Sequence, residues 1–304
     1  MKTERAYPVY VDTWKSGRLE EKTGTALSRL SSCTLCPRMC RVNRLKEEKG
    51  ICRTGCMAVV SSAHPHYGEE SPISGYHGSG TIFFSNCNLG CVFCQNADIS
   101  HMGTGSETDA ETLAGIMLAL QGKGCHNINL VTPSHVIPQI LEALSIAIPS
   151  GLRTPLVYNT SGYDRVSSLH LLDGVIDIYM PDFKCWDPEV AGTICHAHDY
   201  PDVARKALRE MYRQVGDLQT DERGVAVRGL LVRHLVLPED LAGTASVMNF
   251  LTREVSPETF VNIMDQYHPA WKARETPGLE RSITAREYNE ALRLAMDSGL
   301  NVLD

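Results

Sequence analysis

From residue 81 onward, short apolar segments alternate with longer segments in which apolar residues recur every three or four positions. None of the short segments shows the strict polar–apolar alternation of a half-exposed strand. Continuous apolar runs between amphipathic helices are typical of parallel strands that are buried on both faces. We therefore expect six buried strands, at residues 81–85, 127–132, 155–160, 175–180, 227–237 and 259–266.

Helix signals lie between these strands. Thr108 and Glu111 have the spacing of a capping box, and Thr284 and Glu287 repeat it before the last expected helix. An apolar stripe over residues 203–215 predicts another helix. Six strand–helix units are too few to close an eight-stranded barrel. We therefore expect an α/β fold, a partial (β/α)6 TIM-like barrel.

The N-terminal part of the chain lacks this alternation. Residues 1–30 are mostly polar, and we expect a surface-wrapping arm with one short helix near residues 24–30. A cysteine-rich segment and a connector rich in glycine, serine and proline follow. We expect an N-terminal arm and cysteine-rich metal-binding extension over residues 1–75, and the partial barrel over residues 76–304.

Composition and charge narrow the functional classes. A chain of 304 residues with 43% hydrophobic residues is ordinary for a soluble globular protein. Its net charge of −7 and its lack of a basic run argue against nucleic-acid and membrane-surface binding. There is no apolar N-terminal signal and no run of about 18 apolar residues, so we expect a cytoplasmic protein. Eleven cysteines then indicate metal binding rather than a secreted disulfide framework.

Three cysteines follow the first expected strand with the spacing C-x3-C-x2-C, at Cys87, Cys91 and Cys94. Soft thiolates suit iron, and a closed 4Fe–4S site uses four of them. Three would leave one iron open to a substrate or cofactor. The alternatives are a structural metal knuckle and three buried thiols.

A second set of cysteines lies nearer the N-terminus, at Cys33, Cys36, Cys40 and Cys52. Four thiolates on tight loops suit either zinc or an Fe–S cluster, and both alternatives stay open. Because the segment has few apolar residues, a metal would hold it folded where a core could not. Cys56 is the expected spare, although it could replace Cys52. The other cysteines are expected to be buried thiols outside both sets: Cys125, Cys185 and Cys195.

Polar residues gather where the expected strands end. Parallel strands direct their carboxyl ends to one edge, where barrels of this kind bind ligands. Arg233 lies inside the apolar fifth strand, and a buried guanidinium needs an anionic partner. We expect that partner to be the carboxylate of a bound ligand. The other candidates at this edge are Thr132, Ser134, Asn159, Ser161, Asp182, Lys184 and Gln266.

Together these motifs resemble the radical S-adenosylmethionine (SAM) superfamily. The chain is most similar to the pyruvate formate-lyase activating enzyme branch, and in particular to its activating-enzyme-related Fe–S proteins. The resemblance covers most of residues 33–300. Its carriers are residues 33–40, 87–96, 129–133, 177–184, 228–238 and 264–267.

The resemblance implies that the C-x3-C-x2-C cysteines hold a 4Fe–4S cluster whose open iron binds the amino and carboxylate groups of SAM. It implies that Phe93 contacts adenine and that Asp182 and Lys184 engage the methionine moiety. Arg233 has a position commonly near SAM. Residues 132–134 are Thr-Pro-Ser, where many members carry the Gly-Gly-Glu motif that holds the methionine amino group.

The implied reaction is reductive cleavage of SAM to a 5′-deoxyadenosyl radical, followed by hydrogen abstraction. We expect a glycyl-radical-enzyme activating protein, with a protein or peptide substrate and a flavodoxin or ferredoxin as electron donor. One alternative is a radical SAM enzyme that modifies a small molecule or another protein side chain. The other is a non-catalytic Fe–S or zinc scaffold.

Overall fold

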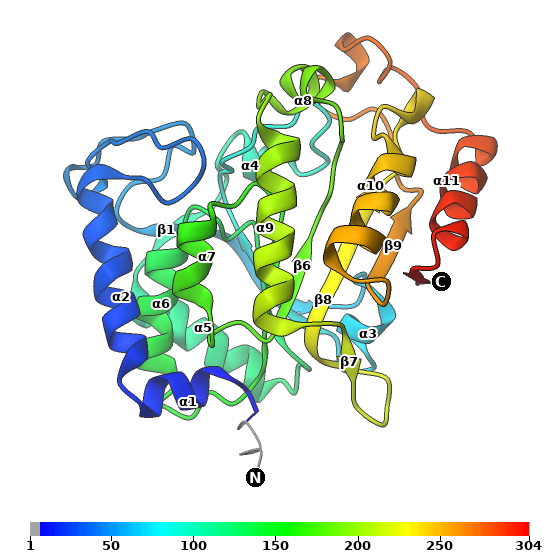
Figure 1. Ribbon diagram of the computed structural model, residues 1–304. Coiled ribbons are helices and arrows are strands. Elements are labelled where there is room, and N and C mark those ends of the chain that lie inside the picture. Colours follow the sequence, from blue (N-terminus) through cyan, green and yellow to red (C-terminus); the bar gives the residue numbers. More distant parts are fainter. Residues whose placement is uncertain (1–6, 304) are drawn as a thin grey trace.

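The computed structural model describes residues 7–303. Its centre is a sheet with six neighbouring parallel strands, and helices cover the outer side of this sheet (Figure 1). The six parallel strands are β2 (Ser79–Phe84), β4 (Ile128–Val131), β5 (Leu156–Thr160), β6 (Ile178–Pro181), β8 (Ala226–Leu235) and β9 (Phe260–Met264). Each of them overlaps one of the six predicted strands. The predicted partial (β/α)6 barrel is therefore confirmed.

Within the described residues, four further strands complete this sheet, three of them at its edges and one beside β8. They are β1 (Ala58–His66), β3 (Ser106–Thr108), β7 (Gln219–Thr220) and β10 (Asn301–Val302). The strand order is β10-β9-β8-β6-β5-β4-β2-β1-β3, with β7 beside β8. β1 runs antiparallel to both β2 and β3, whereas β10 runs parallel to β9. The chain thus approaches the first barrel strand through an antiparallel hairpin.

Helices follow the strands as predicted, and one of the two predicted N-terminal caps is present. The longer ones are α5 (Ala110–Gly122), α6 (Ile137–Ala147), α7 (Val166–Leu172), α8 (Pro188–Cys195), α9 (Tyr200–Val215), α10 (Thr244–Phe250) and α11 (Ala285–Asp297). Short helical segments are α3 (Ser71–Ser74), α4 (Ala97–Ser100), a π-turn at Leu251–Val255 and 3₁₀ turns at Pro238–Asp240 and Ala273–Glu275. The capping box of Thr284 and Glu287 is present at α11. At α5, the prediction of Thr108 as the cap is wrong, because Asp109 accepts the Thr112 N–H at 2.8 Å.

The N-terminal segment is more deeply packed than the predicted surface arm. It forms two helices, α1 (Tyr10–Lys15) and α2 (Arg18–Ser28), and α2 packs against α6 and α7 in the outer layer (Figure 1). The Tyr10 hydroxyl is buried and donates to the Thr154 carbonyl at 2.8 Å. The few apolar residues of these helices belong to the main core, so their scattered spacing concealed a buried face. The part of the prediction that concerns residues 1–6 lies outside the described residues.

The cysteine-rich loop, which we define as residues 33–56, extends beyond the end of α2 (Figure 1). Helical turns at Arg29–Ser32 and Arg44–Lys46 lie before it and within it. Its own apolar cluster is small, with Leu30, Cys33 and Leu35 as the buried members. No helix within residues 7–303 combines the length and the apolar character needed to cross a membrane.

Candidate functional site

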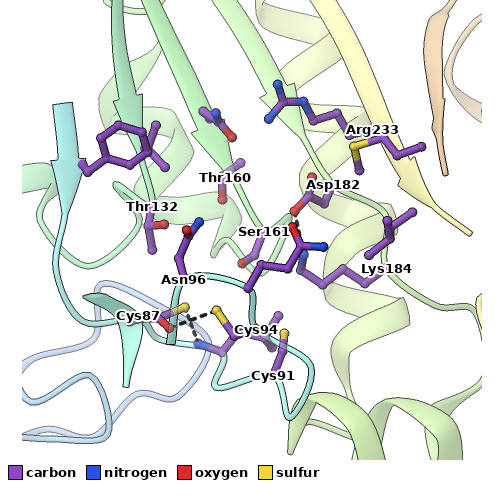
Figure 2. Close-up of a pocket in the computed structure, with 18 of the residues that line it drawn as sticks. Cys87, Cys91, Cys94, Asn96, Thr132, Thr160, Ser161, Asp182, Lys184 and Arg233 are labelled. Atoms are coloured by element: carbon purple, nitrogen blue, oxygen red, sulfur yellow. Dashed lines mark hydrogen bonds and ion pairs between the residues drawn. The ribbon is translucent and has the colours of Figure 1, made fainter. Parts of the chain in front are cut away.

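A cavity of about 530 Å³ lies at the carboxyl ends of the parallel strands, and its size is typical of small-molecule sites. Figure 2 shows the strands ending toward a loop that carries three cysteines. Ser134 is absent from the cavity lining, and its hydroxyl instead contacts that of Thr160 at 3.1 Å. The predicted residues that do line the cavity are Cys87, Cys91, Phe93, Cys94, Thr132, Asn159, Ser161, Asp182, Lys184, Arg233 and Gln266.

The cluster loop, defined as residues 87–94, presents its sulfur atoms to hydrogen-bond donors. The Leu89 N–H donates to the Cys87 sulfur at 3.3 Å, and the Ser100 hydroxyl lies 3.0 Å from the Cys94 sulfur. Burial raises the pKa of Cys87 to about 11, so the metal-free thiol is protonated at neutral pH. A bound metal deprotonates its thiol ligands outright. Three such thiols on one cavity wall form a donor set that fits an Fe–S cluster.

A cation lies beside the middle cysteine of this loop. The Lys184 ammonium donates to an Asp182 carboxylate oxygen at 2.6 Å, and both side chains are largely buried. Burial lowers the pKa of Lys184, but Asp182 and the neighbouring cysteines raise it by more, so the ammonium stays charged. This pair is therefore not the surface ion pair that loop residues often form. It places a fixed positive charge where a cluster would bring negative charge.

Cys195 has a position that the sequence did not reveal. It is buried, as predicted, at the end of α8, yet its sulfur lies 3.6 Å from that of Cys91. The loop and the helix are also joined by a hydrogen bond from the Val92 N–H to the Ile194 carbonyl at 2.9 Å. Because 104 residues separate the two cysteines, no local spacing could have linked them.

Arg233, which we expected to pair with the carboxylate of a bound ligand, has anionic partners within the chain. Its Nε donates to Glu70 at 2.7 Å, and its Nη2 pairs with both Glu69 and Glu70. Asn262 donates to Glu70 at 2.7 Å, and Asn129 donates to Glu69 at 2.9 Å. Burial raises the pKa of Glu70, but these donors lower it by more, so the carboxylate stays ionised.

Glu69, Glu70, Arg233 and Asn262 line the cavity and form what we call its acidic floor, with Asn129 supporting it through Glu69. Figure 2 shows Arg233 at the end of the cavity away from the three cysteines. Glu69 and Glu70 were missed because they lie in the connector before β2, where no periodic pattern marks a buried residue. The sequence did contain one signal for these residues: two adjacent glutamates in the connector, and an arginine in an apolar strand that contains no acidic residue. A chain that buries one charge must bury its counter-charge too.

The second cysteine set gathers in the cysteine-rich loop, apart from the cavity. Burial raises the pKa of Cys36 to about 12, and the thiols of Cys52, Cys33 and Cys40 contribute to this rise because they lie near it. Cys56 instead interacts with Glu47, whose carboxylate accepts the Cys56 N–H at 3.2 Å. Within residues 7–303, no three cysteine, histidine or acidic side chains lie close enough, as they are oriented here, to hold a single metal ion, so a metal at this set would require the cysteine side chains to turn toward one another.

Arg44 supplies positive charge beside this set. Its side chain is buried, its Nη2 lies in the interior without a hydrogen-bond partner, and it acts to lower the pKa of Cys52 against a larger effect of burial. Four neighbouring thiols and a buried guanidinium suit a site that carries net negative charge when its cysteines are thiolates.

Comparison with known proteins places the chain in a family. No family model matches the sequence. MJ0674, an uncharacterized protein of Methanocaldococcus jannaschii, is 31% identical over 299 residues, which cover 95% of this chain and 81% of that protein. The chain belongs to the MJ0674 family. The shared region of this family therefore includes both the cysteine-rich loop and the barrel.

Solved structures with a similar fold were found for this MJ0674-family protein. A radical SAM methyltransferase from Sphaerobacter thermophilus superposes with a TM-score of 0.52 at 15% identity, over 73% of this chain and 64% of the methyltransferase chain. The chain thus spans less than two thirds of that structure's length. Streptococcus suis SuiB bound to precursor peptide SuiA has a TM-score of 0.49 at 11% identity, over 71% of this chain and 46% of SuiB. The likeness to the methyltransferase is one of fold.

Proposed function

We propose that this protein is a radical SAM enzyme that binds a 4Fe–4S cluster at Cys87, Cys91 and Cys94. The observation that carries the proposal is the convergence of three thiols of one loop on a cavity that also holds Asp182 and Lys184. When bound, a cluster with an open iron supplies the electron that cleaves SAM to a 5′-deoxyadenosyl radical for hydrogen abstraction.

The cavity side chains have roles that follow from their positions. Lys184, held by Asp182, stabilises thiolate charge at Cys91. Phe93 is buried beside Tyr267, with ring centres 6.3 Å apart, and offers a face for adenine. Thr132 has a φ of 60°, a backbone conformation that glycine adopts readily and a β-branched residue rarely does. That strain supports a ligand-positioning role at the place where many members of the family that the sequence resembles carry glycine.

Loss of one cluster ligand tests this proposal. Anaerobically reconstituted, reduced protein should release 5′-deoxyadenosine from SAM, measured by liquid chromatography with mass spectrometry. Cys91→Ala should abolish the release, because the cluster loses a ligand. Cys125→Ala is the matched control, since Cys125 lies against Gly80 at the start of β2, away from the cavity. Undiminished release in Cys91→Ala would contradict the cluster assignment.

Within this chemistry, we propose activation of a glycyl-radical enzyme as the function. The substrate is then a backbone glycine of a partner protein or peptide, and a flavodoxin or ferredoxin supplies the electron. Co-expression with a candidate partner should give a glycyl-radical EPR signal only when the wild-type protein is present.

The second candidate is modification of a small molecule or another protein side chain, and the cavity volume of about 530 Å³ favours the small molecule. If SAM cleavage proceeds and no glycyl radical forms, this candidate replaces the first. An absence of SAM cleavage in cluster-replete protein favours the non-catalytic scaffold instead.

The second cysteine set is proposed as a separate metal site with Cys33, Cys36, Cys40 and Cys52 as ligands. Zinc and iron analysis of anaerobically purified protein identifies the metal. Cys36→Ala should reduce the content of that metal and leave the cluster ligands in place. Unchanged metal content in this variant would refute the site.

A further inference from the structure

Arg38 links the cysteine-rich loop to the cluster loop. Its Nε donates to the Asn88 carbonyl at 3.0 Å, and its Nη2 donates to the Leu89 carbonyl at 2.7 Å. Both carbonyls belong to the turn between the first two cluster cysteines. Its Nη1 donates to the His196 carbonyl at 2.7 Å, just beyond α8. One guanidinium therefore joins three separate segments.

The environment of Arg38 fixes its orientation. The guanidinium lies 5.2 Å from the centre of the Tyr163 ring, a distance suited to a cation–π contact. The Tyr163 carbonyl in turn accepts a hydrogen bond from the Asn88 side chain at 2.8 Å. Charge-assisted bonds from a planar, forked donor give geometric specificity as well as energy. A displacement of Arg38 therefore removes the donor from both carbonyls of the turn and from the His196 carbonyl at once.

Residues of the cysteine-rich loop also contact the chain on either side of the cluster loop. Arg53 follows a cysteine of the second set, and its Nη2 donates to the Ser100 carbonyl at 3.2 Å. Asn86, directly before the cluster loop, donates to the Thr54 hydroxyl at 3.2 Å. The residues on both sides of the cluster loop thus contact residues that neighbour the second cysteine set.

A third arginine reaches the next loop of the cavity. Arg44 donates to the Gly55 carbonyl at 2.8 Å and to the His135 carbonyl at 2.7 Å. The His135 ring contacts the Ser85 carbonyl at 3.0 Å, close to the end of β2. The loop after β4, which supplies Thr132 to the cavity, is therefore held by the cysteine-rich loop as well.

We propose that the cysteine-rich loop is a metal-dependent positioning element for the cluster loop, with Arg38 as the positioning residue. The inference rests on the two metal sites proposed above. The cysteine-rich loop has a small apolar cluster, so its order depends on bound metal. Once ordered, it holds Arg38, Arg44 and Arg53 in place, and the cluster loop receives its hydrogen bonds without a further loss of conformational entropy.

Hydrogen exchange in the iron-free protein tests this coupling. Zn²⁺ alone should slow exchange in residues 33–56 and also in residues 86–96. In Arg38→Ala, zinc should still protect residues 33–56, whereas its effect on residues 86–96 should shrink roughly tenfold with the lost charge-assisted bonds. Arg41→Ala is the matched control, since Arg41 is an exposed residue of the same loop, and it should behave as wild type.

Two further variants separate the coupling from simpler explanations. Cys36→Ser removes a ligand of the second set. Any zinc protection of residues 86–96 that remains in this variant comes from zinc bound directly at the cluster loop, and we expect no such protection. Arg38→Lys keeps the charge but loses the fork, and it should restore only part of the protection. Unchanged exchange in β5 shows that each variant is folded.

The cluster itself provides a spectroscopic check. After iron loading, the EPR signal of the reduced cluster should differ from wild type in Arg38→Ala and should match wild type in Arg41→Ala. Equal zinc protection of residues 86–96 in Arg38→Ala and wild type overturns the coupling. Absence of any zinc protection at residues 33–56 in wild type overturns the zinc-dependent coupling, while metal analysis decides the second metal site and SAM cleavage, measured separately, decides the proposed function.

Discussion

Arg233 is a charge that the sequence marks as needing a partner without showing which one. An apolar strand around a guanidinium demands an anion, because an isolated buried charge is very unfavourable. The partner Glu70 lies 163 residues away in the chain, in a segment without periodic pattern. The pattern of apolar residues predicts that a strand is buried. It cannot identify the distant side chain that the tertiary structure brings into contact with that strand.

The first residue-scale prediction concerns this acidic floor. Glu70→Gln should lower the free energy of unfolding by about 2 kcal/mol, because Arg233 then keeps only Glu69 as a buried counter-charge. Urea denaturation followed by circular dichroism measures the change. The control is Glu20→Gln at an exposed position of α2, which should change stability by less than about 0.5 kcal/mol. Equal stability of the two variants would show that the ion pair contributes nothing.

The second concerns His135, which is buried near the end of β4. Burial lowers its pKa from 6.5 to about 4, so the unfolded chain takes up a proton at a higher pH than the folded chain does. Its contribution to stability is therefore complete above pH 6.5 and is lost as the pH falls toward 4, by up to about 3 kcal/mol. Urea titrations between pH 7 and 4.5 should show a steeper decline for wild type than for His135→Asn. Parallel declines would exclude this histidine as the cause.

At the scale of elements, the strands and the edge that carries the cavity could be predicted, because buried parallel strands leave continuous apolar runs and direct their ends to one side. The short helix expected near residues 24–30 overlaps the end of α2, but the first turns of α2 could not be predicted, because Leu19 is surrounded by polar residues. The cap of α5 was wrong by one residue, since Thr108 and Asp109 are both good caps and the pairing of β3 with β1 takes Thr108 into a strand. The convergence of Cys195 on Cys91 depends on the packing of α8, which no spacing encodes.

Gly162 offers a test at this scale, because it connects β5 to the next helix close to the end of β6. Its φ is +76°, and a Cβ there would lie 2.4 Å from the Asp182 carbonyl oxygen. Gly162→Ala should therefore lower the free energy of unfolding by more than about 2 kcal/mol. It should also displace the Asp182–Lys184 pair. Gly124→Ala is the matched control, with a φ of +82° and open space around the added atom, and it should show backbone strain alone.

Differential urea denaturation and the affinity for SAM, measured by calorimetry on the cluster-loaded protein, check this prediction. If Gly162→Ala loses no more stability than Gly124→Ala, the chain around Asp182 shifts to accommodate the added Cβ at no measurable cost in stability. Unchanged SAM affinity would separate the Asp182–Lys184 pair from the binding of that ligand.

At the scale of the whole molecule, the N-terminal helices and the barrel share one hydrophobic core. Tyr10 and Leu19 belong to the same cluster as residues of β4 and α6, so the helices do not form an independent folding unit. The division into residues 1–75 and 76–304 stays a prediction about architecture, and cooperative unfolding across it is what the packing implies.

Truncation of one buried aromatic tests this cooperativity. Tyr10→Ala should lower the unfolding free energy of the entire chain by about 3 kcal/mol, with fluorescence and circular dichroism still following a single transition. Tyr67→Ala, at a side chain that is 65% exposed, is the control and should have little effect. Two separate transitions in Tyr10→Ala would instead indicate that the N-terminal helices melt on their own.

The acidic floor also restricts how a polymer can use the cavity. Because Glu69 and Glu70 are tied to side chains of β4, β8 and β9, the inner end of the cavity is crossed by an ion pair and its hydrogen bonds. A polypeptide in the cavity would meet this ion pair at the inner end, so we expect it to enter and leave by the same mouth. An internal stretch of a substrate protein would have to fold back on itself as a hairpin tip, whereas a free chain end could enter as a single extended strand.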